Sequence, residues 1–204
     1  MIMEWTKNFA YAIGLFTADG CLSSDNRHLE FCSKDEEQVL NFVKCLNLSN
    51  RITKKTRAKE KVKKYYRVQF GNKNLYNFLC SIGLSPRKSL ILEKVIVPKE
   101  FFADFLRGLF DGDGSFNVFK HPESRHPQIR VRFTSASPKF IRWLFHEIKE
   151  KLKTNGFISK ANRAEELEFA IKDSFKLLDY MYYSSDVVCL SRKFKKVKKY
   201  LMRM

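Results

Sequence analysis

The stretch FLRGLFDGDG, residues 105–114, leads an apolar helical pattern directly into two aspartates separated by one glycine. A similar stretch, YAIGLFTADG, occupies residues 11–20. When the two are aligned, glycine, leucine, phenylalanine, aspartate and glycine coincide at positions 14/108, 15/109, 16/110, 19/113 and 20/114, a constant offset of 94 residues in a chain of 204. The repeat indicates a duplicated unit, and we expect an N-terminal half at residues 1–95 and a C-terminal half at 96–204.

The rest of each half predicts the same order of helices and strands. In the first half, a helix ending near Asp19 precedes strand patterns near 27–33, 51–57 and 64–70 and helices near 35–46 and 73–82. In the second half, Val97-Pro98 favours a helix that starts near Lys99. Strands are then expected near 115–120, 128–135, 156–163 and 166–171, and helices near 138–152 and 173–183. The sequence therefore predicts an α+β fold with two similar halves.

The net charge of +17 favours a polyanionic partner, because self-repulsion of this size is relieved by binding one. Two runs concentrate the charge: residues 51–64 hold eight Lys or Arg against one Glu, and residues 192–203 hold seven with no acid. A basic run can also be a solvated face or a flexible tail, and this alternative stays open for 192–203. Nucleic acid is the polyanion that we expect.

The cysteines and the apolar segments indicate the compartment. The five cysteines contain no C-x-x-C pair, which argues against a disulfide framework or a zinc knuckle. We expect reduced, mostly buried thiols. No apolar run approaches the length of a membrane span, and the N-terminal residues lack the layout of a secretory signal. An intracellular protein with no membrane partner is predicted, in the cytoplasm or an organelle.

Several predicted strands alternate apolar and polar residues. In residues 128–134, Ile129, Val131 and Phe133 share one face, and the residues between them share the other. A sheet face rich in Arg, Gln and Thr suits the DNA major groove, where Arg reads guanine and Gln reads adenine. A solvated sheet face is the alternative. The candidate DNA-binding residues are Arg51, Thr53, Lys55, Arg57, Arg67, Gln69, Gln128, Arg130, Arg132, Lys160 and Arg163.

The paired motifs also suggest chemistry. A glycine inside an apolar helix costs about 1 kcal/mol relative to alanine, so Gly14 and Gly108 suggest that two backbones approach closely. If the helices pack side by side in the same sense, Asp19 and Asp113 emerge together at their C-terminal ends. Two carboxylates there favour hard cations with a preference for oxygen ligands. Asp111 to Gly114 do not open an EF-hand, because Phe116 and Pro122 occupy the positions of its Gly and Glu.

The two stretches, AIGLFTADG at 12–20 and LRGLFDGDG at 106–114, resemble the signature of LAGLIDADG homing endonucleases in the single-chain, two-motif form. Five of nine positions match in the first and six of nine in the second. The resemblance implies an α+β fold with two pseudosymmetric αββαββα halves, the motif helices at their interface, and two saddle-like antiparallel sheets that grip DNA.

The resemblance also implies site residues. The metal-binding acids fall on Asp19 and Asp113, with the backbone carbonyls of Ala18 and Gly112 as additional ligands. The basic residue beside each site falls on Lys88 and Lys193, although Arg192 could replace Lys193. Water-ordering residues would be Ser33 and Lys34 in the first half and Ser135 in the second, where Ala136 stands opposite Lys34. Thr17 replaces the first acid of the motif.

The function implied is site-specific cleavage of both strands of double-stranded DNA at a long, asymmetric target, leaving 3′ overhangs. We expect a monomer that uses Mg²⁺, or Mn²⁺ in its place, with Ca²⁺ supporting binding without cleavage. One alternative is an intron maturase, an RNA-binding splicing cofactor on the same fold. The other is a DNA-binding regulator that has lost cleavage. The two retained aspartates favour the endonuclease, because neither alternative needs both.

Overall fold

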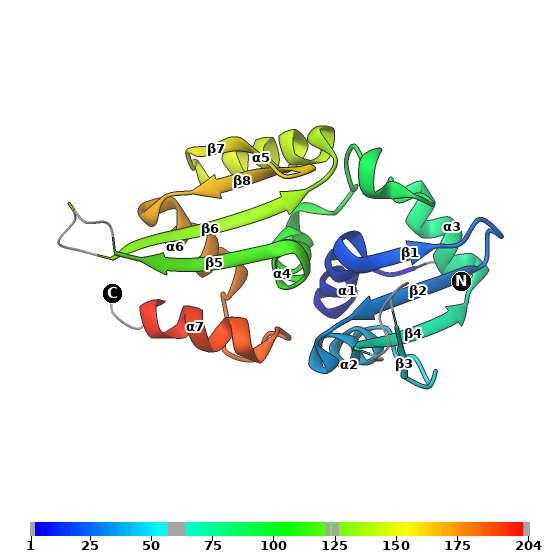
Figure 1. Cartoon of the computed structure of the whole chain (residues 1–204). Coiled ribbons are helices and arrows are strands. Elements are labelled where there is room, and N and C mark those ends of the chain that lie inside the picture. Colours follow the sequence, from blue (N-terminus) through cyan, green and yellow to red (C-terminus); the bar gives the residue numbers. More distant parts are fainter. Residues whose placement is uncertain (1–2, 57–63, 121–122, 124–126, 202–204) are drawn as a thin grey trace. The chain divides into compact units, whose positions relative to one another are not determined.

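The computed structural model describes residues 3–56, 64–120, 123 and 127–201. The chain divides into two compact units: the first holds residues 1–88, 95–112 and 188–190, and the second holds 89–94, 113–187 and 191–204. Each unit contains one four-stranded antiparallel sheet (Figure 1). In the described ranges, no helix is both long and apolar enough to cross a bilayer.

The first unit opens with seven elements in the order αββαββα. These are α1 (Lys7–Asp19), β1 (Gly20–Leu22), β2 (His28–Ser33), α2 (Glu36–Cys45), β3 (Thr53–Lys55), β4 (Tyr65–Gly71) and α3 (Lys73–Ser81). The strand order in the sheet is β1-β2-β4-β3. Leu29, Phe31, Val68 and Phe70 alternate with exposed or half-buried residues along β2 and β4. They bury one face of the sheet, and the ring of Phe31 stacks on Phe42 of α2.

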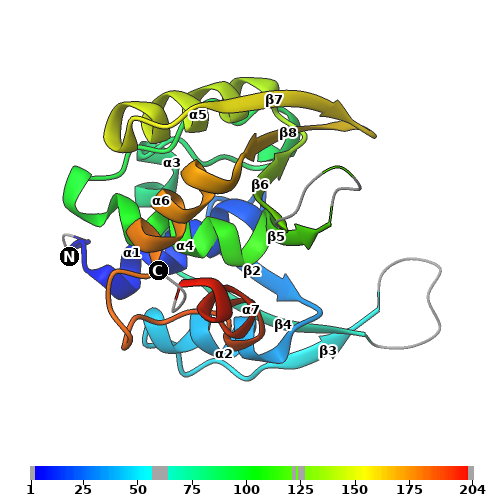
Figure 2. The same ribbon diagram turned by 90° about the vertical axis from the view of Figure 1, so that its left-hand side faces the viewer.

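The second copy repeats this order. Its elements are α4 (Phe102–Asp113), β5 (Gly114–Phe119), β6 (Gln128–Ser135), α5 (Pro138–Leu152), β7 (Gly156–Ala161), β8 (Ala164–Phe169) and α6 (Ile171–Met181), followed by α7 (Ser191–Leu201). Short 3-10 turns lie at Lys88–Leu90 and Lys99–Phe101. The sheet has the order β5-β6-β8-β7, and α5 and α6 cover the same side of it (Figure 2). Helix α4 belongs to the first unit as far as Gly112.

Local signals in the sequence explain where two of the helices, α3 and α5, begin. The Asn72 side chain accepts a hydrogen bond from the backbone N–H of Leu75, which caps α3 as expected. Pro138 occupies the first turn of α5, where its missing N–H costs nothing. Its N-cap, Ser137, donates instead to the carbonyl oxygen of Leu92, so this hydroxyl fixes the connecting segment to the helix start.

The predicted α+β fold with two αββαββα copies is confirmed, but three details differ. Strand β1 was not expected, because three residues are too few for a visible alternation. The basic run at 192–203 is helical from Ser191 to Leu201, and it buries Lys193 and Val197 on one side. The cysteines are not mostly buried: Cys21 and Cys80 are exposed and the other three are half-buried. Desolvation nevertheless raises the pKa of Cys32, Cys45 and Cys189 to about 11.

Candidate functional site

The two motif helices contact each other through their glycines inside the first unit. A Cβ atom on Gly14 would lie 2.1 Å from the carbonyl oxygen of Phe105, and one on Gly108 would lie 2.1 Å from that of Tyr11. Backbone atoms cannot rotate away from such a contact, so a side chain at either position would force the helices apart. The predicted close approach of these backbones is confirmed.

The aspartates lie at the C-terminal ends of these helices. Asp19 is the last residue of α1 and is half-buried, as is Ala18, and Asp113 is the last residue of α4 and is exposed. Gly112 comes close to the first motif: a Cβ there would lie 2.3 Å from the Cβ of Ala18 and 3.6 Å from Asp19 Oδ2. Glycine at this position therefore lets the second motif pack directly against Ala18, next to the Asp19 carboxylate.

Two buried lysines occupy matching positions beside the motifs. Lys88 Nζ donates a hydrogen bond to the carbonyl oxygen of Gly20, the residue after Asp19, and it lies over the Phe16 ring. Lys193 Nζ donates to the carbonyl oxygen of Gly114, the residue after Asp113, at 2.6 Å. Both side chains are buried, whereas Arg192 is exposed. The geometry thus pairs Lys88 with Lys193 rather than with Arg192.

The serines at the ends of β2 and β6 also match each other. Ser33 Oγ accepts from the backbone N–H of Asp35 at 3.1 Å, and Ser135 Oγ accepts from that of Ser137 at 3.2 Å. Ser33 also donates to Gln38 Oε1 at 2.7 Å. Both hydroxyls therefore turn the chain from a strand into a helix, and ordering of water by them stays a prediction. Lys34 is exposed, with its ammonium group over the Tyr65 ring.

A buried polar network in the first unit was missed by sequence reasoning. Asp111 Oδ2 accepts hydrogen bonds from the Tyr11 hydroxyl and from the backbone N–H of Leu190, each at 2.7 Å. Arg107 pairs with Asp104 at 2.6 Å and donates to the carbonyl oxygen of Val188 at 2.8 Å. Burial, and then the Asp111 carboxylate, raises the pKa of Tyr11 well above its ordinary value. The network fixes residues 188–190, which lead into α7, against the motif helices.

Thr17 shows how the two motifs differ at the position of their first acid. Its hydroxyl donates to the carbonyl oxygen of Ile13 in its own helix, at 2.8 Å. Asp111, at the matching position of the second motif, instead bonds Leu190, a residue 79 positions away. The first acid of the second motif therefore has a structural role, which the first motif replaces with a local hydrogen bond.

Four of the candidate DNA-binding residues share the face of the first sheet that no helix of the first unit covers among the described residues; we call this the uncovered face. The strand register aligns Thr53 with Arg67 and Lys55 with Tyr65, so Thr53, Lys55, Arg67 and Gln69 share one face. Glu30 of β2 lies opposite Gln69 on that face. Lys55 donates to Glu30 Oε1, and Arg67 Nη1 lies 3.5 Å from Glu30 Oε2. This face is therefore an ordered array of basic and acidic groups.

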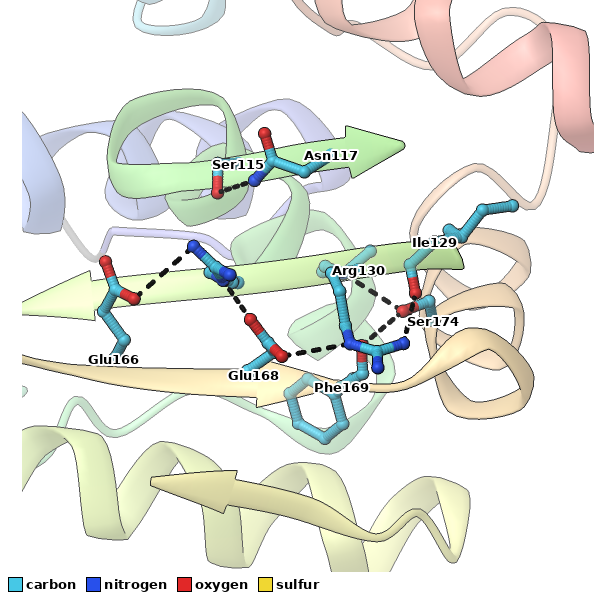
Figure 3. A network of polar contacts seen from close by, with 10 residues as sticks. Ser115, Asn117, Ile129, Arg130, Glu166, Glu168, Phe169 and Ser174 are labelled. Atoms are coloured by element: carbon cyan, nitrogen blue, oxygen red, sulfur yellow. Dashed lines mark hydrogen bonds and ion pairs between the residues drawn. The ribbon is translucent and has the colours of Figure 1, made fainter. Parts of the chain in front are cut away.

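The second sheet carries a similar array of basic and acidic side chains, part of which Figure 3 shows. Gln128, Arg130, Arg132 and Thr134 alternate with the buried Ile129, Val131 and Phe133, as predicted. Arg130 Nε donates to Glu168 Oε1 at 3.0 Å, and Arg132 Nε donates to Glu168 Oε2. The Arg130 guanidinium also lies over the Phe119 ring, 5.7 Å from its centroid. Glu30 and Glu168 were not anticipated from the sequence.

The other candidate DNA-binding residues lie elsewhere. Arg51 is exposed just before β3, and Arg163 is exposed in the turn between β7 and β8, with φ of 62°. Lys160 aligns with Glu165, which places it on the sheet face of Leu167, opposite the face of Arg132 and Glu168. Arg57 lies outside the described residues.

The ligand set expected at the motifs contains oxygen donors only. In the described part of the chain, no group of three or more His, Cys, Asp or Glu side chains is arranged to hold a metal ion. A Mg²⁺ ion, however, needs only one or two carboxylates, since waters and substrate phosphates complete its octahedral shell. The Asp19 and Asp113 carboxylates are donors of the kind that such an ion prefers, whereas a softer, His- or Cys-preferring metal would find no matching donors in the two motifs, which contain neither residue.

Comparison with protein families gives a match over most of the chain. Residues 6–83 and 100–168 match the model of the LAGLIDADG-like domain. A relative of known sequence, a probable translation initiation factor IF-2 of Methanocaldococcus jannaschii, is 27% identical over 196 residues. This alignment covers 91% of the present chain but only 14% of the factor, so the chain spans a small part of that relative's length.

Solved structures share the fold at low sequence identity. The homing endonuclease I-WcaI bound to its DNA recognition sequence is 14% identical with a TM-score of 0.65, over 96% of this chain and 88% of that one. I-DmoI in complex with DNA and Ca is 15% identical with a TM-score of 0.58, over 94% and 97%. The N-terminal LAGLIDADG domain of DUF199/WhiA is 17% identical with a TM-score of 0.57, over 95% and 88%.

Proposed function

The chain belongs to the LAGLIDADG family in its single-chain, two-motif form, and from this premise we propose that it is a site-specific DNA endonuclease. It hydrolyses both strands of a long, asymmetric duplex target and leaves 3′ overhangs. Residues 1–95 and 96–204 are the two copies of the duplicated unit, and the protein acts as a monomer.

The matched surroundings of the two motif aspartates carry this proposal. Each aspartate ends a motif helix, each is followed by a glycine that begins a strand, and each glycine carbonyl accepts a hydrogen bond from a buried lysine. A structural role for the aspartates would not require a lysine to be buried in the same way beside each of them. Burying a lysine is costly, so its repetition supports a function at both sites.

The residues divide the work of phosphodiester hydrolysis. Asp19 and Asp113 bind divalent cations, Mg²⁺ or Mn²⁺, with the carbonyls of Ala18 and Gly112 as further ligands. When bound, such ions activate water and neutralise the charge that develops on the phosphate. Lys88 and Lys193 hold positive charge beside each scissile phosphate. Ser33, Lys34 and Ser135 order water at the strand ends. Because Ala136 replaces the counterpart of Lys34, the two strands are cut at different rates.

Double-stranded DNA is the proposed partner of the uncovered sheet faces. The net charge of +17, the arginines on both faces and the DNA-bound structures with the same fold support this assignment. Ca²⁺ supports binding without cleavage, in line with the DNA complex of I-DmoI that contains Ca. Arg51, Arg163 and Lys160 contact phosphates rather than base edges, since Arg51 and Arg163 lie outside the strands and Lys160 lies on the other face of its sheet.

The genetic setting that we propose is a mobile intron or an intein. Alignment of the chain with 14% of a translation initiation factor supports the intein, because a homing endonuclease carried inside a host protein would give such a match. The second candidate function is a DNA-binding regulator that does not cleave. The chain shares its fold with DUF199/WhiA as well as with homing endonucleases, and this is the reason to test the regulator function. If the chain were an RNA-binding maturase, its basic surfaces would bind RNA in place of DNA.

The test uses a duplex selected for binding in Ca²⁺ from a random library. Asp19→Asn and Asp113→Asn should bind this duplex with nearly unchanged affinity in Ca²⁺, and each should lose double-strand cleavage in Mg²⁺. Asp179→Asn, an exposed change on α6, is the control and should cleave normally. Cleavage of both strands by Asp19→Asn at the wild-type rate would show that the proposed metal role is wrong.

A further inference from the structure

Glu168 joins the two arginines at the centre of the second sheet's uncovered face (Figure 3). The strand register places Glu168 of β8 directly opposite Arg132 of β6. One carboxylate oxygen accepts the Nε–H of Arg130 and the other accepts the Nε–H of Arg132. Glu166, two residues earlier on β8, lies 3.6 Å from Arg132 Nη1. One side chain thus orients both arginines.

Burial makes these contacts persistent. The Glu168 side chain is 10% exposed, whereas those of Arg130 and Arg132 are 20% and 34% exposed. A nearly buried carboxylate that lost its partners would carry the full cost of an uncompensated charge. Rotating either arginine towards a DNA phosphate would break its bond to Glu168, so the phosphate contact is penalised.

The same contacts leave part of each guanidinium available. Each arginine uses its Nε–H on Glu168, and a guanidinium has four more N–H donors on its two terminal nitrogens. Arg130 Nη1 also donates to the carbonyl oxygen of Ile129 at 3.1 Å, so three of its terminal donors remain. Two parallel donors of this kind match O6 and N7 of guanine in the major groove. Arg130 and Arg132 lie two residues apart on one strand, about 6.8 Å, which corresponds to about two base pairs of DNA.

We propose that Glu168 is a specificity-determining residue that fixes Arg130 and Arg132 to read two guanines about two base pairs apart. This inference rests on the proposed function, because it assumes that the uncovered face meets the DNA major groove. Glu168 favours the target sequence indirectly, since it makes the same arginines poor ligands for phosphates of unrelated DNA.

A carboxylate also joins two basic groups on the first sheet. Burial raises the pKa of Glu30, but hydrogen bonds from Lys55 and Cys32 outweigh it and hold that pKa below its ordinary value. Lys55 responds in the opposite direction: its burial is outweighed by the bond to Glu30, which raises its pKa. Both groups therefore stay charged at neutral pH, so an acidic residue orients basic ones on each of the two faces.

The experiment measures, in Ca²⁺, how strongly the protein discriminates between the four bases at each position of the target, as a ratio of binding affinities. The duplex selected for the wild type is compared with all its single-base variants and with a random duplex, for the wild type, Glu168→Gln, Glu168→Asp and Glu147→Gln. Glu147 is the matched control, because it carries the same charge on α5 and pairs only with Lys151 among the described residues, at 3.4 Å. Thermal unfolding of each variant is followed in parallel.

For the wild type, we expect two guanines about two base pairs apart whose replacement weakens binding about tenfold or more. Glu168→Gln should lose most of this discrimination at those two positions alone. It should also bind random duplex more tightly, with a log–log salt slope steeper by about 0.9, as for one added phosphate contact. Glu168→Asp should lose discrimination at one or both positions with a smaller change in slope, because it keeps the charge but cannot reach both arginines.

Two kinds of result would overturn the inference. One is a Glu168→Gln variant that keeps wild-type discrimination, or weakens all duplexes alike in proportion to a lower unfolding temperature. The other is a Glu147→Gln variant that changes discrimination as much as Glu168→Gln, which would assign the effect to net charge. A wild-type protein that discriminates at no position would instead refute the proposed function itself, and the inference with it.

Discussion

Replacing Gly108 with alanine should destabilise the protein, because its backbone contacts another backbone. The added Cβ would lie 2.1 Å from the carbonyl oxygen of Tyr11 and 3.0 Å from the amide nitrogen of Leu15, well inside the 3.4 Å at which ordinary contact begins. Neither atom can rotate away, so α1 and α4 would have to separate by about 1 Å at their crossing. A gap of this size forfeits a quarter to a half of each contact energy around it.

The magnitude follows from two opposing terms. Overpacking in a fully buried place costs typically about 1–3 kcal/mol and occasionally more, and this overlap with rigid backbone belongs at the upper end. Alanine recovers about 1 kcal/mol through its better helix propensity. We therefore expect a net loss of about 2 kcal/mol or more in the free energy of unfolding. For a chain of this size, that lowers the unfolding temperature by roughly 4–8 °C.

The assay is thermal and urea unfolding followed by circular dichroism, with Gly71→Ala as the control. Gly71 is exposed in β4, and the nearest atom to its added Cβ is Arg27 Nε at 3.1 Å, at the far end of a flexible side chain. This control should stay within about 1 kcal/mol of the wild type. If Gly108→Ala unfolded at or above the wild-type temperature, the backbone contact between the motif helices would be refuted.

Lys193→Met should lower the rate of strand cleavage by about 100-fold, with affinity for DNA in Ca²⁺ changed only a few-fold, because it removes a charge beside the scissile phosphate but keeps the apolar stem. Arg192→Met, at an exposed position, should cleave normally; equal losses in both variants would refute the pairing of Lys193 with Lys88. In the loop before β2, hydrogen bonds from the backbone N–H and the ring of His28 lower the pKa of Asp25 from 3.8 to about 2. A carboxyl whose pKa is lowered in the folded state stabilises the fold at pH values above its ordinary pKa. The difference in unfolding temperature between the wild type and Asp25→Ala should therefore be largest above about pH 4 and vanish as the pH falls through 2. A difference that persisted below pH 2 would contradict this assignment.

The motifs and the strand patterns could be predicted because they depend on local sequence. Gly14 and Gly108 stand out inside apolar helices, where a glycine needs a packing reason, and the structure supplies that reason. The alternation of residues 128–134 gave the buried face of β6 in the same way. Each feature can be recognised within about ten residues, one as a glycine that breaks the helix propensity of its segment and the other as a regular alternation of apolar and polar residues.

Features that depend on long-range register could not be predicted. Glu168 lies 38 and 36 residues from the arginines it orients, and nothing in the sequence says which strand lies beside β6. Similarly, Asp111 accepts a hydrogen bond from a residue 79 positions away, and Arg107 donates one to a residue 81 positions away. The sequence could not decide whether Lys193 or Arg192 is the counterpart of Lys88, because the choice depends on which of the two α7 buries. Charge and composition predicted a polyanionic partner, but they did not predict which residues are arranged together to contact it.

Cleavage of a selected duplex distinguishes an endonuclease from a DNA-binding regulator. A random duplex library is enriched for binding to the full chain in Ca²⁺, and Mg²⁺ is then added to the winning sequence. We predict cleavage of both strands at one position within that sequence, leaving 3′ overhangs. Tight, sequence-specific binding with neither strand cut in Mg²⁺ or Mn²⁺ would contradict it and favour a DNA-binding regulator, and failure to enrich any DNA would point to RNA.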